Sequence, residues 1–303
     1  MKKFSPEDRE VFQKAYGSLS LPLAEQNFKW LLLNSMTSFY NDVEWDIINK
    51  NLCLFVTFEG VRYVWGPPLP GEKLQETLEK CFSLCEEYNK AHSITAKPEL
   101  LYLPDEYVPQ YSKLSGFLVK HQNQDYIYNS KELVKLEGGI HKKKRNLINS
   151  LLKSNEVTSE TYSAEKHEKA CLNLLERWKS QKEELVPDDY EEKFRQEADM
   201  AEKTLKLTPN LSLTGLVVFV NGNLEGFTLG DRINENMCSI FVEKTNLSIK
   251  GLPPFIFTEF VKKCWSSCEL INAGEDWDVE YLKVSKMSYR PAIIHRFHTL
   301  FRK

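Results

Sequence analysis

The stretch "LTGLVVFVNGNLEGFTLGD", Leu213 to Asp231, carries the strongest structural signal in this chain of 303 residues. Two runs rich in apolar and β-branched residues flank the pair Asn221-Gly222. An Asn-Gly pair between such runs favours the positive φ angles of a tight hairpin turn. The stretch therefore predicts two antiparallel strands, and "MCSIFVE", Met237 to Glu243, predicts a third strand beside them.

The segments around this hairpin alternate between helical and strand patterns. Two helices are predicted before it, at Ala164 to Gln181 and Asp188 to Leu207. The elements predicted after it are a helix at Pro254 to Trp265, a strand at Glu269 to Asn272, a helix at Asp278 to Lys286 and a strand at Ala292 to His298.

The first half of the chain repeats this order. Helices are predicted from Pro6, with Ser5 as the N-cap, and near Leu23 to Met36. The later elements are two strands around a Glu59-Gly60 turn that end at Pro67-Pro68, a helix at Glu72 to His92, a strand at Leu100 to Leu103, a helix at Asp105 to Leu114 and a strand at Phe117 to Tyr128. We therefore expect two similar mixed α/β domains, 1–129 and 130–303, packed around a cleft, although a chance repeat of a common α/β layout is the alternative.

Composition narrows the class of protein. Hydrophobic residues make up 42%, charged residues 27%, and the formal net charge is −3, so anionic partners would require local basic patches. No apolar run approaches the roughly 20 residues of a membrane span, and the N-terminus lacks a signal peptide's apolar region. The seven cysteines form no CxxC pair and lack further ligands at metal-site spacing, so we expect reduced thiols, no metal and a cytoplasmic location.

Positive charge is concentrated in "GGIHKKKRNLINSLLKSN", Gly138 to Asn155. A helical apolar pattern follows the run His141 to Arg145, which places the cations at a helix N-terminus, where the helix dipole disfavours them. Free N–H groups, the dipole and several cations would together bind a phosphate. A solvated charged surface is the alternative. On a helical wheel Lys144 points toward the apolar arc, so either its stem snorkels or its charge is held in a cleft.

A second charged segment, "INAGEDWDVEYLKVSKMSYRP", spans Ile271 to Pro291. Glu275 and Asp276 precede a predicted helix, and Lys286 and Arg290 lie at or beyond its far end. Acids at the start and bases at the end of a helix also satisfy the helix dipole, so charge alone leaves a purely structural explanation open.

This segment resembles the closing motif of a bacterial family named for the C-terminal domain of phosphatidylglycerol lysyltransferase. The motif has an Asn, a Glu-Asp pair and a helix that leads to Leu, Lys and Ser-Tyr-x-Pro. The matching positions are Asn272, Glu275, Asp276, Leu282, Lys286, Ser288, Tyr289 and Pro291. A second match is the segment "DYIYNSKELVKLEGGIHKKKRNLIN", at Tyr126, Tyr128, Leu133, Leu136, Lys143, Lys144, Arg145 and Asn146.

The resemblance implies two tandem acyltransferase domains of the Gcn5-related N-acetyltransferase (GNAT) type. Relatives include Fem-type peptidoglycan aminoacyltransferases and lysyl-lipid synthases, which pass an aminoacyl group from a charged tRNA to an acceptor. Aminoacyl-tRNA is thus the implied donor, and an anionic lipid or a phosphorylated precursor the implied acceptor. Ala273, Gly274 and Asp278 depart from the usual pattern, which leaves the acceptor open.

These implied partners assign roles to the two charged segments. Glu275 and Asp276 are expected to orient the nucleophile, and Lys286, Tyr289 and Arg290 to hold a phosphate or the developing oxyanion. The residues expected to bind a phosphate are Lys142, Lys143, Lys144, Arg145 and Asn146.

The loop "NLSIKGLPPFIF", Asn246 to Phe257, tests whether acetyl-CoA is the donor instead. A pyrophosphate cradle at this position needs backbone N–H groups, but Pro253 and Pro254 remove two of them. No cofactor is therefore expected. Two alternatives to aminoacyl transfer stay open: a non-catalytic protein that binds a phosphorylated ligand, and a CoA-dependent N-acyltransferase.

Overall fold

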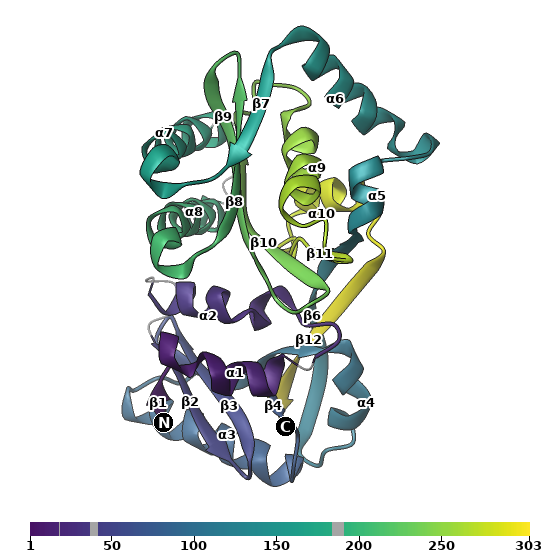
Figure 1. The fold of residues 1–303 in the computed structure, drawn as a ribbon. Helices are drawn as coiled ribbons and strands as arrows, with labels where there is room; N and C mark the ends of the chain where they lie inside the picture. The colour runs from purple at the N-terminus through teal and green to yellow at the C-terminus, as the bar shows by residue number, and fades with distance from the viewer. Residues whose placement is uncertain (18, 37–41, 184–190) are drawn as a thin grey trace. The chain divides into compact units, whose positions relative to one another are not determined.

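The computed structural model describes residues 1–17, 19–36, 42–183 and 191–303 (Figure 1). Its contacts divide the chain into two compact units. The first unit comprises Met1–Tyr126, Gly274–Lys286 and Ile293–Lys303, and the second comprises Ile127–Ala273 and Met287–Ala292. Two C-terminal segments are thus counted with the first unit, and the sequence-based division into 1–129 and 130–303 stays a prediction.

The first unit contains a mixed sheet with the strand order β1-β2-β3-β4-β5-β12-β6. Strands β2 to β4 are antiparallel, β5 runs parallel to β4, and β12 pairs antiparallel with β5. The strands are β1 (Lys2–Lys3), β2 (Asp42–Ile48), β3 (Asn51–Phe58), β4 (Val61–Leu69), β5 (Glu99–Pro104), β12 (Ile293–Arg302) and β6 (Phe117–Asn129). The helices are η1 (Pro6–Asp8), α1 (Arg9–Tyr16), η2 (Ala24–Gln26), α2 (Phe28–Ser35), α3 (Leu74–Ala91), η3 (Asp105–Tyr107), α4 (Val108–Tyr111) and α10 (Glu280–Met287).

Helix α3 forms the core of the first unit against the sheet. Leu78, Cys81, Phe82 and Cys85 recur at helical spacing, so they share one face of α3. All four are fully buried in a cluster that also contains Phe55 of β3. The pair Cys81 and Cys85 therefore packs as small apolar side chains.

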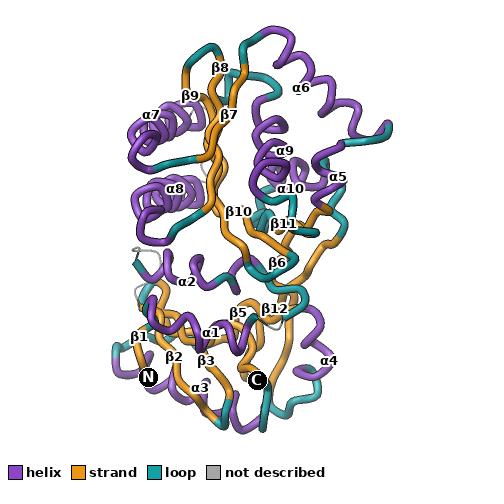
Figure 2. Tube along the Cα trace, in the orientation of Figure 1, coloured by secondary structure: helices purple, strands orange, loops and turns teal. Residues whose placement is uncertain are grey.

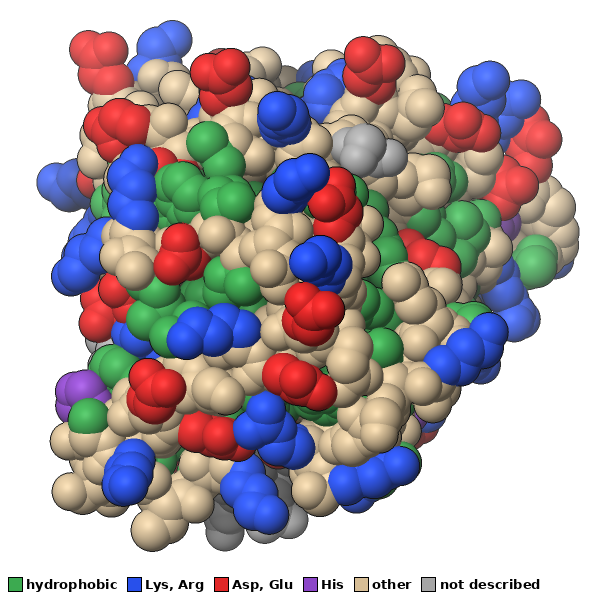
Figure 3. All heavy atoms as spheres, turned by 90° about the horizontal axis from the view of Figure 1, so that it is seen from below, with side chains coloured by type: hydrophobic (Ala, Val, Ile, Leu, Met, Phe, Trp, Pro, Cys, Tyr) green, Lys and Arg blue, Asp and Glu red, His purple; other side chains and the backbone are tan. Residues whose placement is uncertain are grey.

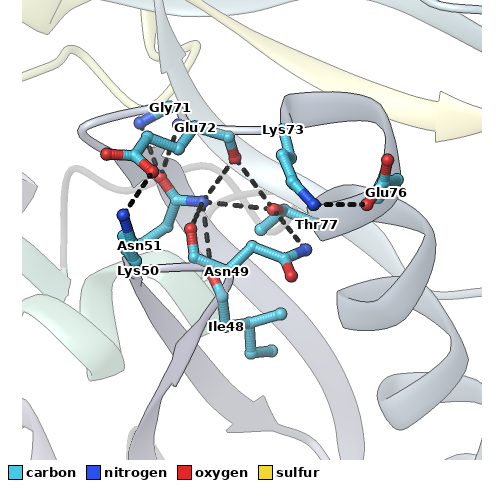
Figure 4. A network of polar contacts seen from close by, with 9 residues as sticks. All are labelled: Ile48, Asn49, Lys50, Asn51, Gly71, Glu72, Lys73, Glu76 and Thr77. Atoms are coloured by element: carbon cyan, nitrogen blue, oxygen red, sulfur yellow. Dashed lines mark hydrogen bonds and ion pairs between the residues drawn. The ribbon is translucent and has the colours of Figure 1, made fainter.

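Asn51, at the start of β3, fixes the turn that leads into α3 (Figure 4). Its side-chain oxygen accepts hydrogen bonds from the backbone N–H groups of Gly71 (2.6 Å) and Glu72 (2.8 Å). Its amide nitrogen donates to the carbonyl oxygen of Glu72 (2.7 Å) and to Thr77 Oγ1 (3.1 Å). This fully buried side chain thus supplies partners that backbone groups in a tight turn would otherwise lack.

The second unit has the strand order β6-β11-β10-β9-β8-β7. Helices α7 and α8 cover one face of its sheet and α9 covers the other (Figures 1 and 2). The strands are β7 (Val157–Thr161), β8 (Thr214–Val220), β9 (Asn223–Arg232), β10 (Met237–Thr245) and β11 (Leu270–Asn272). The helices are α5 (Ser130–Lys135), η4 (Gly139–His141), α6 (Lys142–Ser154), α7 (Ala164–Glu183), α8 (Glu191–Leu211) and α9 (Leu252–Cys264).

The predicted hairpin is confirmed. Val220 and Asn223 are paired across the turn, and Asn221 and Gly222 both have positive φ angles, 50° and 79°. The mixed α/β fold class with a tandem repeat of the order of elements is confirmed as well. The helix predicted at Asp188 to Leu207 begins outside the described residues, so its predicted start at Asp188 is not tested.

The same order of elements occurs twice: three antiparallel strands, a helix, a parallel strand, a helix and a last strand. The first repeat is β2-β3-β4-α3-β5-α4-β6, and the second is β8-β9-β10-α9-β11-α10-β12. The last strands are exchanged between the two units. Strand β12 ends the second repeat but pairs with β5, whereas the end of β6, Ile127–Asn129, pairs with β11. The pairing of β12 with β5 explains why Ile293–Lys303 belong to the first unit.

Several elements differ from the prediction. Strand β4 continues through Pro67 and Pro68 to Leu69, because a register shift between Leu52 and Leu54 of β3 accommodates residues that cannot donate to a regular ladder. Strands β2 and β7 were not predicted, and both carry charged residues on a partly exposed surface. Within the described residues, no helix has both the length and the apolar character needed to span a bilayer.

Candidate functional site

The first unit contains an acidic cluster, which we define as Glu25, Asp125, Glu275 and Asp276. Glu25 lies in η2, Asp125 on β6, and the other two in the loop before α10. Asp125 is fully buried, Glu25 and Asp276 are 6% and 2% exposed, and Glu275 is half-buried. Four carboxyl groups in the interior of one unit are unusual, since buried charges normally require partners.

Hydrogen bonds fix three of these carboxylates. Asp276 accepts from the Tyr126 hydroxyl (2.5 Å) and from the backbone N–H of Asp278 (3.0 Å). Asn123 Nδ2 donates to Glu275 Oε2 (2.7 Å), and the backbone N–H of Ala24 donates to Asp125 Oδ2 (2.8 Å).

Glu25 is less well satisfied. Its Oε2 atom is buried and has no hydrogen-bond partner among the described residues.

The electrostatics of the cluster favour protonation of Glu275. Burial and then the charge of Asp125 raise the pKa of Glu275 to about 8, although the hydrogen bond from Asn123 opposes this. Burial, followed by the charges of Asp125 and Glu275, also raises the pKa of Glu25 well above its ordinary value. Lys286 opposes both shifts. The cluster therefore has an excess of acidic groups that a cation or a proton can neutralise.

Lys286 is the cation predicted from sequence that accompanies this cluster. Its Nζ atom lies 3.4 Å from the carbonyl oxygen of Gly274 and 5.9 Å from the centre of the Tyr126 ring. The structure thus brings Glu275, Asp276 and Lys286 together in the first unit. Within the described ranges, no group of three or more His, Cys, Asp or Glu side chains is arranged to hold a metal ion.

The basic run lies in the second unit and starts α6, as the sequence predicted. Lys144 and Arg145 are held by the protein. Lys144 Nζ lies 3.2 Å from the centre of the Tyr289 ring and 2.8 Å from Ser288 Oγ. The Arg145 guanidinium donates to the carbonyl oxygens of Leu136 and Gly138. Burial lowers the pKa of Lys144 to about 8, with a further contribution from the charge of Lys143.

Of the other residues of the run, His141 is buried, whereas Lys142 and Lys143 are exposed. Lys142, Lys143 and Asn146 line a shallow surface pocket of about 520 Å³ together with Gly139, Ile140 and Leu147.

Of the other predicted residues, Tyr289 packs against Tyr128 and Phe257, and Arg290 is exposed. The structure therefore brings Lys144 and Tyr289 together in the second unit. A single cleft that combines both groups stays a prediction.

The start of α9, where a CoA-type phosphate cradle would lie, is occupied by α6. Gly251 is the N-cap and has a φ of 89°. A Cβ atom added there would lie 2.4 Å from the carbonyl oxygen of Leu147 and 3.2 Å from Cβ of Leu151. Pro253 and Pro254 follow in the first turn. This helix end therefore offers few free N–H groups and little space to a pyrophosphate.

Sequence reasoning missed Glu25, Asp125 and Asn123. Asp125 and Asn123 lie on β6, two residues apart and both buried. Since strand residues two apart point to the same side, a polar pair before the Tyr126 motif was a usable signal. Glu25 gave none, because it stands near the start of a predicted helix, Leu23 to Met36, where an acidic residue is ordinary.

Comparison with known proteins identifies the family. The sequence model of the family described as "Phosphatidylglycerol lysyltransferase, C-terminal" matches residues 23–299. The chain belongs to this family. The resemblance inferred from its two motifs is therefore confirmed.

Solved structures show the same fold. A conserved protein of unknown function from Bacteroides thetaiotaomicron is 22% identical, with a TM-score of 0.85 over 100% of this chain and 99% of that one. L-PGS from Bacillus licheniformis is 14% identical, with a TM-score of 0.60 over 100% of this chain and 93% of that one. An uncharacterized protein of Mycoplasmoides gallisepticum is 25% identical over 190 residues, which span 60% of this chain and only 58% of that relative.

Proposed function

We propose that this family member is an aminoacyltransferase that moves an aminoacyl group from aminoacyl-tRNA to an amine or hydroxyl group of a lipid or phosphorylated precursor. The observation that carries the proposal is the half-buried Glu275 in a cluster with excess acidic groups. Its pKa of about 8 lies close to physiological pH, where a general base is most effective. Membership of the lysyltransferase family supports this class of reaction.

The acidic cluster suits an aminoacyl donor. An aminoacyl ester carries a free ammonium group, and the carboxyl groups of Glu25, Asp125 and Glu275 would attract that cation. The ester is already activated, so correct placement of donor and acceptor supplies much of the rate. Lys286 would face the oxygen that becomes negative during attack.

The reaction is an acyl substitution. The nucleophilic nitrogen or oxygen of the acceptor attacks the ester carbonyl carbon while the Glu275 carboxylate takes the nucleophile's proton. The tetrahedral intermediate then collapses, the bond to the ribose oxygen breaks, and that oxygen takes the proton. Asp276, whose oxygens accept bonds from Tyr126 and Asp278, would position the loop that carries Glu275.

The second charged group would serve the phosphates. Lys142, Lys143 and Asn146 are exposed around a shallow pocket, which fits a phosphate of the donor or the acceptor. Lys144, Arg145 and Tyr289 would support this surface, and Arg290 would add a cation to it. The closed start of α9 favours tRNA over CoA as the donor.

The test is transfer of a radiolabelled aminoacyl group from charged tRNA to vesicles that contain phosphatidylglycerol, or to a phosphorylated peptidoglycan precursor. We expect label in the acceptor, at a rate that rises with pH through about 8. Glu275→Gln should lower kcat by roughly 10²- to 10⁴-fold. Glu87→Gln, an exposed change on α3, should leave kcat unchanged.

Two results would redirect the proposal. Tight binding of a phosphorylated ligand without turnover for any charged tRNA would favour the non-catalytic alternative. Thermal stabilisation by CoA but not by tRNA would favour a CoA-dependent N-acyltransferase.

A further inference from the structure

Helix α6 has an exposed face without acidic residues. No Asp or Glu occurs between Gly138 and Asn155. At 100° per residue, the exposed polar side chains of α6 occupy about two fifths of its circumference. They are Lys142, Lys143, Asn146, Asn149, Ser150, Lys153 and Ser154. Elsewhere, Figure 3 shows a face of the molecule on which acidic and basic side chains are interspersed.

The turn before α6 projects an apolar side chain beside these lysines. Ile140 is 58% exposed, among the most exposed large apolar residues of the described chain. Nothing lies within 4 Å of a Cβ atom added at Gly138 or Gly139, so this turn is open on its outer side. Figure 1 shows the turn at the periphery of the second unit.

The turn that carries Ile140, which we call the apolar tip, is held in place by hydrogen bonds within the protein. The Arg145 guanidinium donates to the carbonyl oxygens of Leu136 and Gly138, which precede the tip. Leu136 and Gly138 both have positive φ angles, 48° and 80°, and the bonds from Arg145 tie this bent backbone to α6. A surface that is ordered before binding loses less conformational entropy when its partner arrives.

An exposed isoleucine beside exposed lysines indicates which of two anionic partners, a lipid bilayer or RNA, fits this surface better. An anionic bilayer attracts the lysines and also accepts the isoleucine below its headgroups. Single-stranded RNA is usually bound by aromatic stacking as well as by cations, but Gly138 to Asn155 contains no Phe, Tyr or Trp. An RNA backbone would bind the lysines and leave Ile140 unused.

We propose that Ile140, Lys142, Lys143 and the exposed face of α6 dock this protein on the surface of an anionic lipid bilayer. Ile140 enters the headgroup region, and the lysines lie over lipid phosphates. The docking needs no catalytic step, so it can succeed or fail independently of the proposed aminoacyl transfer.

Vesicle flotation tests the docking. The full chain should float with vesicles of phosphatidylglycerol and phosphatidylcholine in equal parts, less so at high salt, and not with pure phosphatidylcholine. Each lysine near an anionic surface contributes about five-fold in binding. The double variant K142E/K143E should therefore bind at least about 25-fold more weakly, and Ile140→Ser about tenfold more weakly.

Matched variants control for net charge and for apolar exposure. K166E/K169E makes the same charge change at exposed positions of α7, on the other face of the second unit's sheet (Figures 1 and 2). Ile47→Ser removes an isoleucine that is 51% exposed on β2. Both should bind vesicles like the unaltered protein, and circular dichroism should show that all four variants fold.

Three results would overturn the proposal. The first is no flotation with anionic vesicles. The second is equal loss in the two lysine double variants, or no loss for Ile140→Ser, since either result would mean non-specific attraction. The third is vesicle binding that K142E/K143E leaves unchanged while binding of bulk tRNA is lost, which would assign this surface to RNA.

Discussion

Replacing Glu275 with glutamine should change stability in a way that depends on pH. The pKa of Glu275 is raised from 4.5 to about 8, so its ionisation opposes folding. The stability that the protonated carboxyl provides is fully present below about pH 4.5 and is lost as the pH rises through about 8. At about 1.4 kcal/mol for each unit of pKa, the full loss amounts to as much as about 5 kcal/mol. Glutamine never ionises, and its side-chain oxygen can still accept the hydrogen bond from Asn123.

Urea unfolding at pH 5, 7 and 9 measures this effect, with pH values chosen on both sides of the raised pKa. The free energy of unfolding of Glu275→Gln, relative to the unaltered protein, should be lowest at pH 5 and should rise toward pH 9. Glu87→Gln, at an exposed position, should show no such trend. A difference for Glu275→Gln that stays constant or falls with rising pH would refute the reasoning, because the carboxyl would then be ionised in the folded protein without penalty.

Three further changes test other parts of the structure. Gly251→Ala should lower the free energy of unfolding by about 2–4 kcal/mol, because the added methyl group would clash with a carbonyl oxygen of α6 and the residue has a φ of 89°. In the same urea titration, Gly139→Ala should leave the free energy of unfolding unchanged, because no atom lies within 4 Å of the added methyl group. Asn51→Ala should cost about 3 kcal/mol, seen as a lower Tm, because it leaves two backbone N–H groups of the turn unpaired. An unchanged Tm would show that water replaces the side chain. Tyr289→Leu should lower the pKa of Lys144 further below about 8, because the attraction of the ring for the ammonium group is lost while an apolar neighbour remains. An unchanged or higher pKa in an NMR titration of the lysine would contradict this.

Elements with a strong local pattern were predictable from the sequence. The hairpin around Asn221-Gly222 follows from turn chemistry, and α3 follows from the helical spacing of its buried face. The approach of Lys144 to the apolar side of α6 also followed from the helical wheel, since a residue near the centre of the apolar arc must face the neighbouring structure. In each of these cases the determining residues lie within one or two turns of the chain.

The acidic cluster was only half predictable. Glu275 and Asp276 stand in a motif, but Asp125 is 150 residues away and Glu25 a further 100. The raised pKa values of Glu275 and Glu25 result from burial and from the charges of neighbouring carboxylates, neither of which leaves a local pattern. The sequence also did not indicate which side chains of the basic run are bound within the protein and which are exposed. The partners of Arg145 are backbone carbonyls, and Lys144 rests on a tyrosine 145 residues further along.

The pairing of β12 with β5 sets an order of events during synthesis. Phe297 and Leu300 are fully buried on β12 and belong beside residues close to Pro104, about 190 residues earlier. At ribosomal rates of about 5–20 residues per second, the first unit waits roughly 10–40 s for its last strand. Until then the edge of β5 lacks this partner, and such an edge invites pairing with other chains. The first residues to leave the ribosome are therefore among the last to reach their final structure, and a nascent chain of this protein should need protection by chaperones throughout that interval.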